Sequence, residues 1–209
     1  MNESLIDGDN FYEEIFHASE YGKAGWPSST ILLYKIRIKR ETTKAQKLLH
    51  QSGCSSLQCE RWIRVDNDSC RGFHAETILI QQVNDLLDCL REDRSLFSVR
   101  QISIDIVLSY SPCSNCAKSL IKLKETIENV VFYDRSFIFC DMNVKFANFY
   151  QHYRHENIKN LIKMTHSQIQ LSVFNGLCDW KDFLDNTVKL SLDVQSEYFY
   201  GAWRVRQKR

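Results

Sequence analysis

The feature of this sequence that most constrains its fold is an alternating segment that runs directly into the start of a helix. Apolar side chains occupy every second position of residues 101–110, a pattern typical of a half-buried β-strand. Pro112 follows, and proline is favourable just before a helix because its missing N–H would have no partner there. Cys113 and Cys116 are three residues apart, so on a helix they share one face and can hold a single ion.

A second unit of strand followed by helix lies earlier in the chain. Residues 60–66 are predicted to form its strand, and residues 74–91 its helix. The helix has an apolar stripe at three- and four-residue spacing, made of Ile78, Leu79, Val83, Leu86, Leu87 and Leu90. It opens on His74 and Glu76. Because both motifs follow strands, we expect the two helix N-termini to meet at one edge of a sheet.

The remaining segments complete an α/β pattern. Residues 30–40 alternate and predict a strand that pairs with residues 60–66 across a polar connection. The other predicted strands are residues 130–140 and 169–173, and the other predicted helices are residues 9–20, 114–128 and 143–164, with one or two more after residue 177. A helical link between the last two strands favours a parallel pair. The expected fold is a mixed five-stranded sheet flanked by about six helices, with strands four and five parallel.

The composition predicts one folded domain. The 209 residues are 44% hydrophobic, enough for one core, and contain neither a repeat nor a Pro- or Ser-rich linker. We expect a single domain over residues 1–209, with a core at about 30–190, an acidic N-terminal helix within 1–20, and a C-terminal helix and basic tail at 191–209. Neither a secretory signal nor an apolar membrane span is present, so a cytoplasmic or nuclear, non-secreted protein with reduced cysteines is expected.

Charge is uneven along the chain although the formal net charge is only +1. Residues 23–47 carry seven bases against one acid, and three of these bases, Lys35, Arg37 and Lys39, share the outer face of the first strand. Local basic clusters fit contact with a polyanion. A solvated strand face explains the same pattern equally well. The sequence leaves both interpretations open.

His74, Cys113 and Cys116 together offer three metal ligands. A structural zinc site takes four protein ligands, whereas a catalytic site keeps the fourth position for water, whose pKa the metal lowers. Glu76, two residues after His74, is placed to take and return that water's proton. The alternative is a closed structural site with a fourth ligand, for which the available residues are Cys54, Cys59, Cys70 and Cys140.

The ordered pair H-x-E and P-C-x-x-C is the signature of zinc-dependent nucleobase deaminases. Residues 109–113 (Ser-Tyr-Ser-Pro-Cys) are similar to Ser-Trp-Ser-Pro-Cys of the AID/APOBEC polynucleotide cytidine deaminases. Residues 131–141 resemble that family's fourth strand and the loop after it, and residues 178–183 its Cys-Trp-x-x-Phe. The resemblance, over about residues 30–183, implies a cytidine-deaminase-like three-layer fold, one Zn²⁺ per chain, and deamination of cytosine to uracil in single-stranded DNA or RNA.

The resemblance also implies substrate-binding residues. Thr30 matches the threonine beside the target nucleotide, Asn67 the asparagine that binds the sugar, and the backbone of Ala75 and Ser111 the groups that contact the cytosine edge. Tyr110 stands where the family has its pocket tryptophan. In residues 137–142, Phe137 or Phe139 would contact the base on the 5′ side, with residues 22–29 as the alternative. Asn67 is equally explained as a turn former between Asp66 and Asp68.

Two other functions fit the same motifs. A deaminase of free cytidine or its nucleotides shares the zinc signature, although such enzymes are usually shorter. An inactive family member that only binds nucleic acid is a further alternative, but the intact Glu76 argues against it, since binding needs no proton shuttle. The sequence leaves open whether the substrate is DNA or RNA and whether the protein forms homo-oligomers. It also leaves open a role in immune diversification, antiviral defence or transcript editing.

Overall fold

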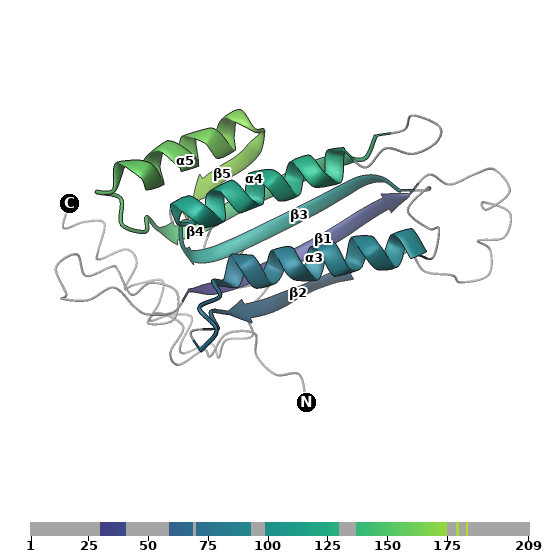
Figure 1. Ribbon diagram of the computed structural model, residues 1–209, viewed down its shortest axis with the longest axis horizontal. Coiled ribbons are helices and arrows are strands. Elements are labelled where there is room, and N and C mark those ends of the chain that lie inside the picture. Colours follow the sequence, from purple (N-terminus) through teal and green to yellow (C-terminus); the bar gives the residue numbers. More distant parts are fainter. Residues whose placement is uncertain are drawn as a thin grey trace, which may run out of the picture.

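A mixed sheet forms the centre of the protein (Figure 1). The computed structural model describes residues 30–40, 59–68, 70–92, 99–129 and 137–174, together with residues 179 and 183. The strands are β1 (Ile31–Arg40), β2 (Cys59–Asp66), β3 (Val99–Tyr110), β4 (Phe139–Asn148) and β5 (Ile169–Val173), in the order β2-β1-β3-β4-β5. β1 runs antiparallel to β2 and β3, whereas β3, β4 and β5 are parallel. The predicted α/β class, the five-stranded mixed sheet and the parallel fourth and fifth strands are confirmed.

Three helices, α3 (Ala75–Glu92), α4 (Ser114–Glu128) and α5 (His155–His166), lie together on one face of the sheet (Figure 1). The described residues thus contain three helices, not the six or so expected. The helix predicted at residues 9–20 lies outside the described residues, and of the segment after residue 177 only Asp179 and Phe183 are described. In this described part of the chain, no helix is both long and apolar enough to span a membrane.

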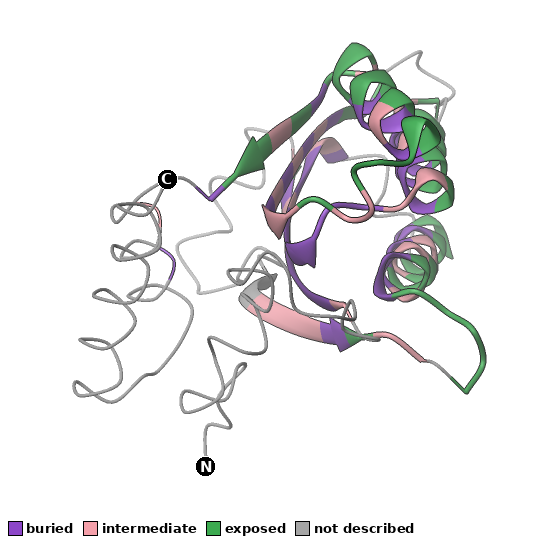
Figure 2. Ribbon diagram, turned by 90° about the vertical axis from the view of Figure 1, so that its left-hand side faces the viewer, coloured by how far each residue is buried: buried purple, intermediate pink, exposed green. Residues whose placement is uncertain are grey.

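The core fills the space between the sheet and its helices, where Figure 2 shows buried residues facing inward and exposed ones on the outer helix surfaces. Alternate side chains of a strand point to opposite faces, so every second residue of β1, β3 and β4 contributes. On α3 the buried residues include Leu79, Val83, Leu87 and Leu90, while Ile78 and Leu86 are partly buried against them. The predicted apolar stripe therefore packs on the sheet.

The opposite face of the sheet combines charged side chains with buried apolar ones, such as the neighbouring Leu33 and Val107. Arg37 lies 2.7 Å from an Asp105 carboxylate oxygen, and the Lys35 ammonium lies 5.0 Å from the centre of the Trp62 ring. Asn143 on β4 donates a further hydrogen bond to Asp105 at 2.9 Å. Lys39 is the exposed member of the predicted basic face. Among the described residues, only Arg37 of these three bases therefore has an acidic partner, since the ring beside Lys35 is uncharged.

The position of strand four differs from the prediction. Residues 130–140 were expected to form it and residues 143–164 to form a helix, but β4 spans Phe139–Asn148 and α5 begins only at His155. The buried residues of β4 alternate, being Cys140, Met142, Val144 and Phe146. Parallel pairing with β3 satisfies the backbone of this segment and determines its boundaries. The helical link between β4 and β5 is the short α5, as the parallel pair requires.

Candidate metal centre

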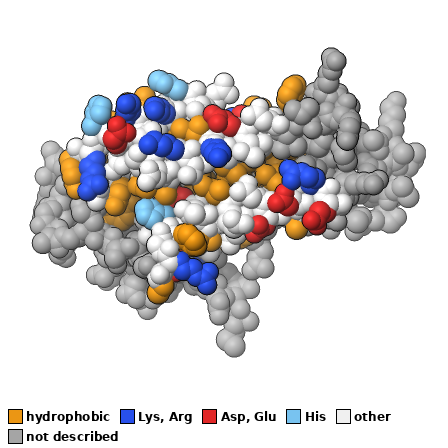
Figure 3. Space-filling model, viewed as in Figure 1, with side chains coloured by type: hydrophobic (Ala, Val, Ile, Leu, Met, Phe, Trp, Pro, Cys, Tyr) orange, Lys and Arg blue, Asp and Glu red, His pale blue; other side chains and the backbone are white. Residues whose placement is uncertain are grey.

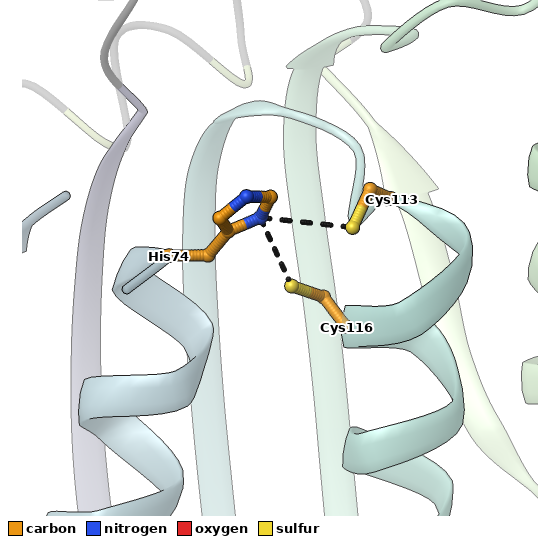
Figure 4. Close-up of side chains that lie close together, drawn as sticks. All are labelled: His74, Cys113 and Cys116. Atoms are coloured by element: carbon orange, nitrogen blue, oxygen red, sulfur yellow. Dashed lines mark hydrogen bonds between the residues drawn. The ribbon is translucent and has the colours of Figure 1, made fainter. Parts of the chain in front are cut away.

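One edge of the sheet gathers both motifs. β3 ends there at Tyr110, and the antiparallel register brings the start of β1 and the end of β2 to the same edge, with Ile31 opposite Asp66 and Leu32 opposite Leu108. α3 begins just after the β2 end and α4 just after the β3 end, so their first turns lie side by side (Figure 4). This edge is called the metal edge below.

His74, Cys113 and Cys116 converge between the first turns of α3 and α4. Their ligand atoms all lie within 4.8 Å of one another. The Nδ1 atom of His74 is 3.6 Å from the Cys113 sulfur and 3.3 Å from the Cys116 sulfur (Figure 4). The three residues that the sequence predicts as ligands are thus brought together by contacts between residues about forty apart in the chain.

The separations fit a tetrahedral zinc ion. Zinc bonds of about 2.3 Å to sulfur and about 2.0–2.1 Å to nitrogen, at tetrahedral angles, place nitrogen and sulfur about 3.6 Å apart. The two measured separations, 3.6 and 3.3 Å, lie close to that value. One imidazole and two thiols also form the soft N/S donor set that zinc prefers. The residues present therefore suit a zinc ion held by three protein ligands.

The electrostatics of the two cysteines favour a bound cation. The hydrogen bond from the Cys116 thiol lowers the pKa of Cys113 to about 5, and backbone N–H groups of the first turn also favour the Cys113 thiolate. The same hydrogen bond raises the pKa of Cys116, as do burial and the nearby Glu76 carboxylate. One thiolate therefore forms readily and a second does not. A cation among the sulfur atoms removes that conflict, because it stabilises both thiolates.

Glu76 is buried behind the ligands, with 3% of its surface exposed. Burial raises its pKa from 4.5 to about 6, against the opposing effects of its own backbone N–H, of His74 and of a hydrogen bond with Cys116. A carboxyl group with a pKa near the working pH can both accept and release a proton. Glu76 thus has the environment that the sequence-based assignment of a proton shuttle requires.

Two of the four cysteines proposed as a fourth ligand can be located. Among the described residues, His74, Cys113 and Cys116 form a metal-binding group without either of them. Cys140 is buried in the first half of β4, opposite Ile102, and burial raises its pKa to about 12. Cys70 is exposed in the turn before α3. Cys54 and the side chain of Cys59 lie outside the described residues. They are the two remaining candidates for the fourth ligand of a closed, structural zinc site.

Thr30, Asn67 and Ala75 lie at the metal edge as expected, but Asn67 and Ala75 form a hydrogen bond with each other. Thr30 is half-buried immediately before β1. The side-chain oxygen of Asn67 accepts a hydrogen bond of 2.8 Å from the Ala75 N–H. That N–H, which the resemblance assigns to the cytosine edge, therefore already has a partner. Asn67 caps the start of α3, and its predicted contact with a sugar stays a prediction.

Tyr110 and Ser111 also lie at this edge and are buried. Tyr110 ends β3, and burial raises its pKa to about 12. By strand alternation its side chain projects to the helix-covered face, as that of Leu108 does. The Ser111 N–H donates to the Asn148 carbonyl at 2.7 Å, and its hydroxyl accepts from the Tyr150 N–H at 2.9 Å. Ser111 therefore fastens the end of β4 to the segment that carries Cys113.

Phe137 and Phe139 are not brought to the site. Phe139 pairs with Gln101 at the start of β3, whereas the metal edge lies at Tyr110, opposite Asn148. Nine residues of strand at roughly 3.3 Å each place these phenylalanines about 30 Å from that edge. Both are exposed, but at the far end of the sheet. The expectation that residues 137–142 follow strand four at the metal edge is wrong. Strand four begins at Phe139, at the far end of the sheet, and reaches the metal edge only at Asn148.

The segment that does follow β4 at the metal edge is residues 149–154, which the sequence-based interpretation placed inside a helix. It carries two exposed aromatic side chains, Phe149 and Tyr153. Hydrogen bonds from Asn157 to the carbonyl groups of Tyr150 and Gln151, at 3.2 and 3.3 Å, hold its middle. The alternation of residues 140–146, followed by a run of polar and aromatic residues, was the signal that could have identified it.

The fold and the site together define a class: an α/β protein in which three residues at two helix N-termini could hold a metal ion, with a buried glutamate beside them. No protein-family model and no curated protein matches the chain. The assignment of a function therefore depends on the geometry of the site and on the sequence motifs.

Proposed function

We propose that this protein is a zinc-dependent hydrolase of the AID/APOBEC type, which deaminates cytosine to uracil in single-stranded DNA or RNA. The observation that carries the proposal is the arrangement of His74, Cys113 and Cys116 around one point, with Glu76 buried beside them. Three ligands leave one position of a tetrahedral zinc ion for water, and the glutamate supplies the proton transfers that hydrolysis needs. The order and spacing of the two motifs support the same class.

The reaction consumes one water molecule and releases ammonia. A bound zinc ion would supply Lewis-acid activation of the water. Glu76 takes a proton from the water and delivers it to N3 of the cytosine ring as the water oxygen attacks C4. Glu76 then carries the second proton to the exocyclic nitrogen, the bond from C4 to that nitrogen breaks, and uracil remains. Its pKa of about 6 suits a group that changes protonation state twice in each cycle.

The surroundings of the site favour a polynucleotide substrate. His74 is exposed, so the metal edge opens to solvent on its side. Phe149 and Tyr153 are exposed in the segment after β4, which ends at the same edge. Aromatic side chains of this kind stack on the bases of single strands. A free nucleoside at the metal group has no neighbouring bases for these rings to stack on.

One assay separates this proposal from its alternatives. The protein should be given single-stranded DNA, single-stranded RNA and free cytidine side by side, with uracil or uridine as the measured product. Turnover of a polynucleotide supports the proposal, turnover of cytidine alone makes the protein a nucleoside deaminase, and no turnover of any substrate with full zinc content overturns the enzymatic proposal.

Glu76→Gln tests the assigned proton shuttle. It should keep zinc, since the ligands are unchanged, and should lose nearly all turnover. Glu92→Gln is the matched control, because it makes the same change at an exposed position at the other end of the same helix. Substantial activity in Glu76→Gln would contradict the mechanism.

A further inference from the structure

Four exposed lysines form a surface over α4 and α5, outside the metal site. Lys118 and Lys122 lie four residues apart on α4, and Lys159 and Lys163 four residues apart on α5, so each pair shares one helix face. Figure 3 shows Lys and Arg side chains gathered over this part of the molecule, and the two helices lie side by side in Figure 1. These four residues are called the lysine surface below.

The lysine surface lacks the ion pairs that several other described basic residues form. Among the described residues, no acidic side chain forms an ion pair with any of its four members, whereas Arg37, Arg64, Arg91, Lys124 and Lys145 all have acidic partners. The exposed acids of α4 and α5 are Glu125 and Glu156, since Glu128 is paired with the buried Lys124. Four lysines against two glutamates leave this face with a net positive charge.

The surface begins near the metal edge and leads away from it. α4 starts one residue after Cys113, and α5 starts beside it, because the Ser114 N–H donates to Asn157 and Asn160 donates to the Ser114 hydroxyl, both at 2.9 Å. The two helices therefore run in the same direction. Four residues of helix rise about 6 Å, so Lys118 lies about one turn and Lys122 about two turns from the site. On α5, Lys159 and Lys163 likewise lie about one and two turns from the helix start, which follows residues 149–154.

We propose that the lysine surface binds the phosphate backbone of the single strand whose cytosine occupies the metal site, an inference that rests on the proposed function. Lysine binds phosphate as a point charge, and a phosphate contact does not distinguish one base from another. Neither α4 nor α5 contains Phe, Tyr or Trp, so these helices offer charge without stacking. The surface therefore adds affinity that depends on salt and on strand length and that is independent of sequence.

The test measures binding, separately from turnover. Protein carrying Glu76→Gln, which leaves the oligonucleotide intact, is titrated with a fluorescent single-stranded oligonucleotide of about 40 nucleotides at several salt concentrations. For single strands the slope of log K against log salt is about −0.7 per phosphate neutralised. Replacing all four lysines with Gln should make that slope shallower by up to about 2.8, and each helix pair alone by up to about 1.4.

Controls separate the surface from general charge loss. Lys39→Gln with Arg91→Gln removes two exposed charges elsewhere and should change the slope far less than Lys118→Gln with Lys122→Gln. Unfolding temperatures check that every variant is folded. Because the lysines reach only the longer strand, deamination of an oligonucleotide just long enough to fill the metal site should be unchanged when the four Gln substitutions are placed in the active protein.

The outcomes distinguish this inference from the proposed function. An unchanged slope in a protein that deaminates polynucleotides would overturn the lysine surface alone. A protein without any deaminase activity would overturn the proposed function, whatever the slope. Binding to vesicles containing phosphatidylserine is measured in parallel. Loss of vesicle binding in the lysine variant, with oligonucleotide binding unchanged, would assign the surface to an anionic membrane and reject the proposal.

Discussion

Asn157 should control both stability and metal affinity, although it contacts no ligand atom. It lies in the first turn of α5, is 5% exposed, and forms hydrogen bonds in two directions. Its side-chain oxygen accepts from the Ser114 N–H at 2.9 Å, just after Cys113, and its amide group donates to the carbonyls of Tyr150 and Gln151. One side chain thus joins the start of the cysteine helix to the segment after β4.

The cost of Asn157→Ala follows from these contacts. Three hydrogen bonds are lost, each worth about 1 kcal/mol net, and partners that stay buried without a new hydrogen bond add to the loss. We expect the free energy of unfolding to fall by about 3 kcal/mol. In a chain of this size, 1 kcal/mol corresponds to about 2–4 °C, so the unfolding temperature should drop by about 6–12 °C. Releasing the Ser114 N–H also loosens the turn that orients Cys113, and loss of such supporting contacts typically costs about 10–100-fold in metal affinity.

Two measurements test this prediction: thermal unfolding, and zinc affinity by competition with a chelator. Asn143→Ala is the matched control, since it removes an asparagine that donates to Asp105 on the opposite face of the sheet. It should lower stability by about 1 kcal/mol and leave zinc affinity unchanged. Equal zinc affinities in the two variants would show that Asn157 supports only the fold, and an unchanged unfolding temperature in Asn157→Ala would refute the hydrogen-bond accounting itself.

Three further predictions concern the site and its surroundings. Cys113→Ser and Cys116→Ser should each lose zinc and soluble protein, because zinc-binding energy is partly folding energy; full zinc by elemental analysis in either variant would remove that cysteine from the ligand set. Burial raises the pKa of Glu76 from 4.5 to about 6, so in the metal-free protein its ionised form costs the fold about 2 kcal/mol. This cost is fully present above pH 6 and absent below pH 4.5, so metal-free Glu76→Gln should unfold at a higher temperature than metal-free wild type at pH 8 but not at pH 4; an equal gain at both pH values would reject the assignment. Exchanging residues 149–154 for another loop should change the preferred base beside the deaminated cytosine, whereas exchanging residues 137–142 should not. Profiling of deaminated sites on one randomised single-stranded library would measure both. The opposite result would assign the contact with the neighbouring base to residues 137–142, at the far end of the sheet.

The sequence was sufficient to predict the metal group of His74, Cys113 and Cys116, because the motifs that identify it are local. The distance between Cys113 and Cys116 is set by helix geometry, and each motif follows a strand that alternation identifies without knowledge of its neighbours. Those strands, β2 and β3, are observed at Cys59–Asp66 and Val99–Tyr110, close to the predicted ranges. Only the meeting of His74 with the cysteines needed the tertiary fold, and the common sheet edge predicted it.

The predicted range of strand four was wrong because local β-propensity favours an earlier segment than the one that pairs with β3. Residues 130–140 are rich in aromatic and β-branched side chains and therefore have strong local β-propensity. Residues 139–148 alternate regularly, with Cys140, Met142, Val144 and Phe146 buried, but they are less rich in such side chains. The observed register, Gln101 opposite Phe139 through Tyr110 opposite Asn148, is decided by pairing with β3. Local β-propensity and hydrophobic alternation therefore favour different segments here, and the alternating segment is the one that pairs with β3.

Buried asparagines were missed for a different reason. Asn157 and Asn160 lie on the inner face of α5 with Leu161 and Met164, where a helical pattern predicts apolar residues. Asn157 is tolerated there because its whole side-chain amide is satisfied by groups from α4 and from the segment after β4. The Asn160 amide nitrogen donates to the Ser114 hydroxyl, while its side-chain oxygen is buried without a hydrogen bond to any described residue. Those partners are distant in the sequence, so composition alone predicts an exposed side chain.

The hydrogen bonds at the metal edge connect the metal motifs to the two segments beside them. Asn67 holds Ala75 in the H-A-E motif, and Ser111, just before Pro112, holds Tyr150. Asn157 extends the second connection to Ser114. A substrate that displaced either neighbouring segment would strain the first turns that orient the ligands, so binding at these segments and geometry at the metal are energetically coupled. Under the proposed function, the residues that could adjust base preference without disturbing the metal group are therefore the exposed side chains Phe149 and Tyr153, and not the backbone that carries them.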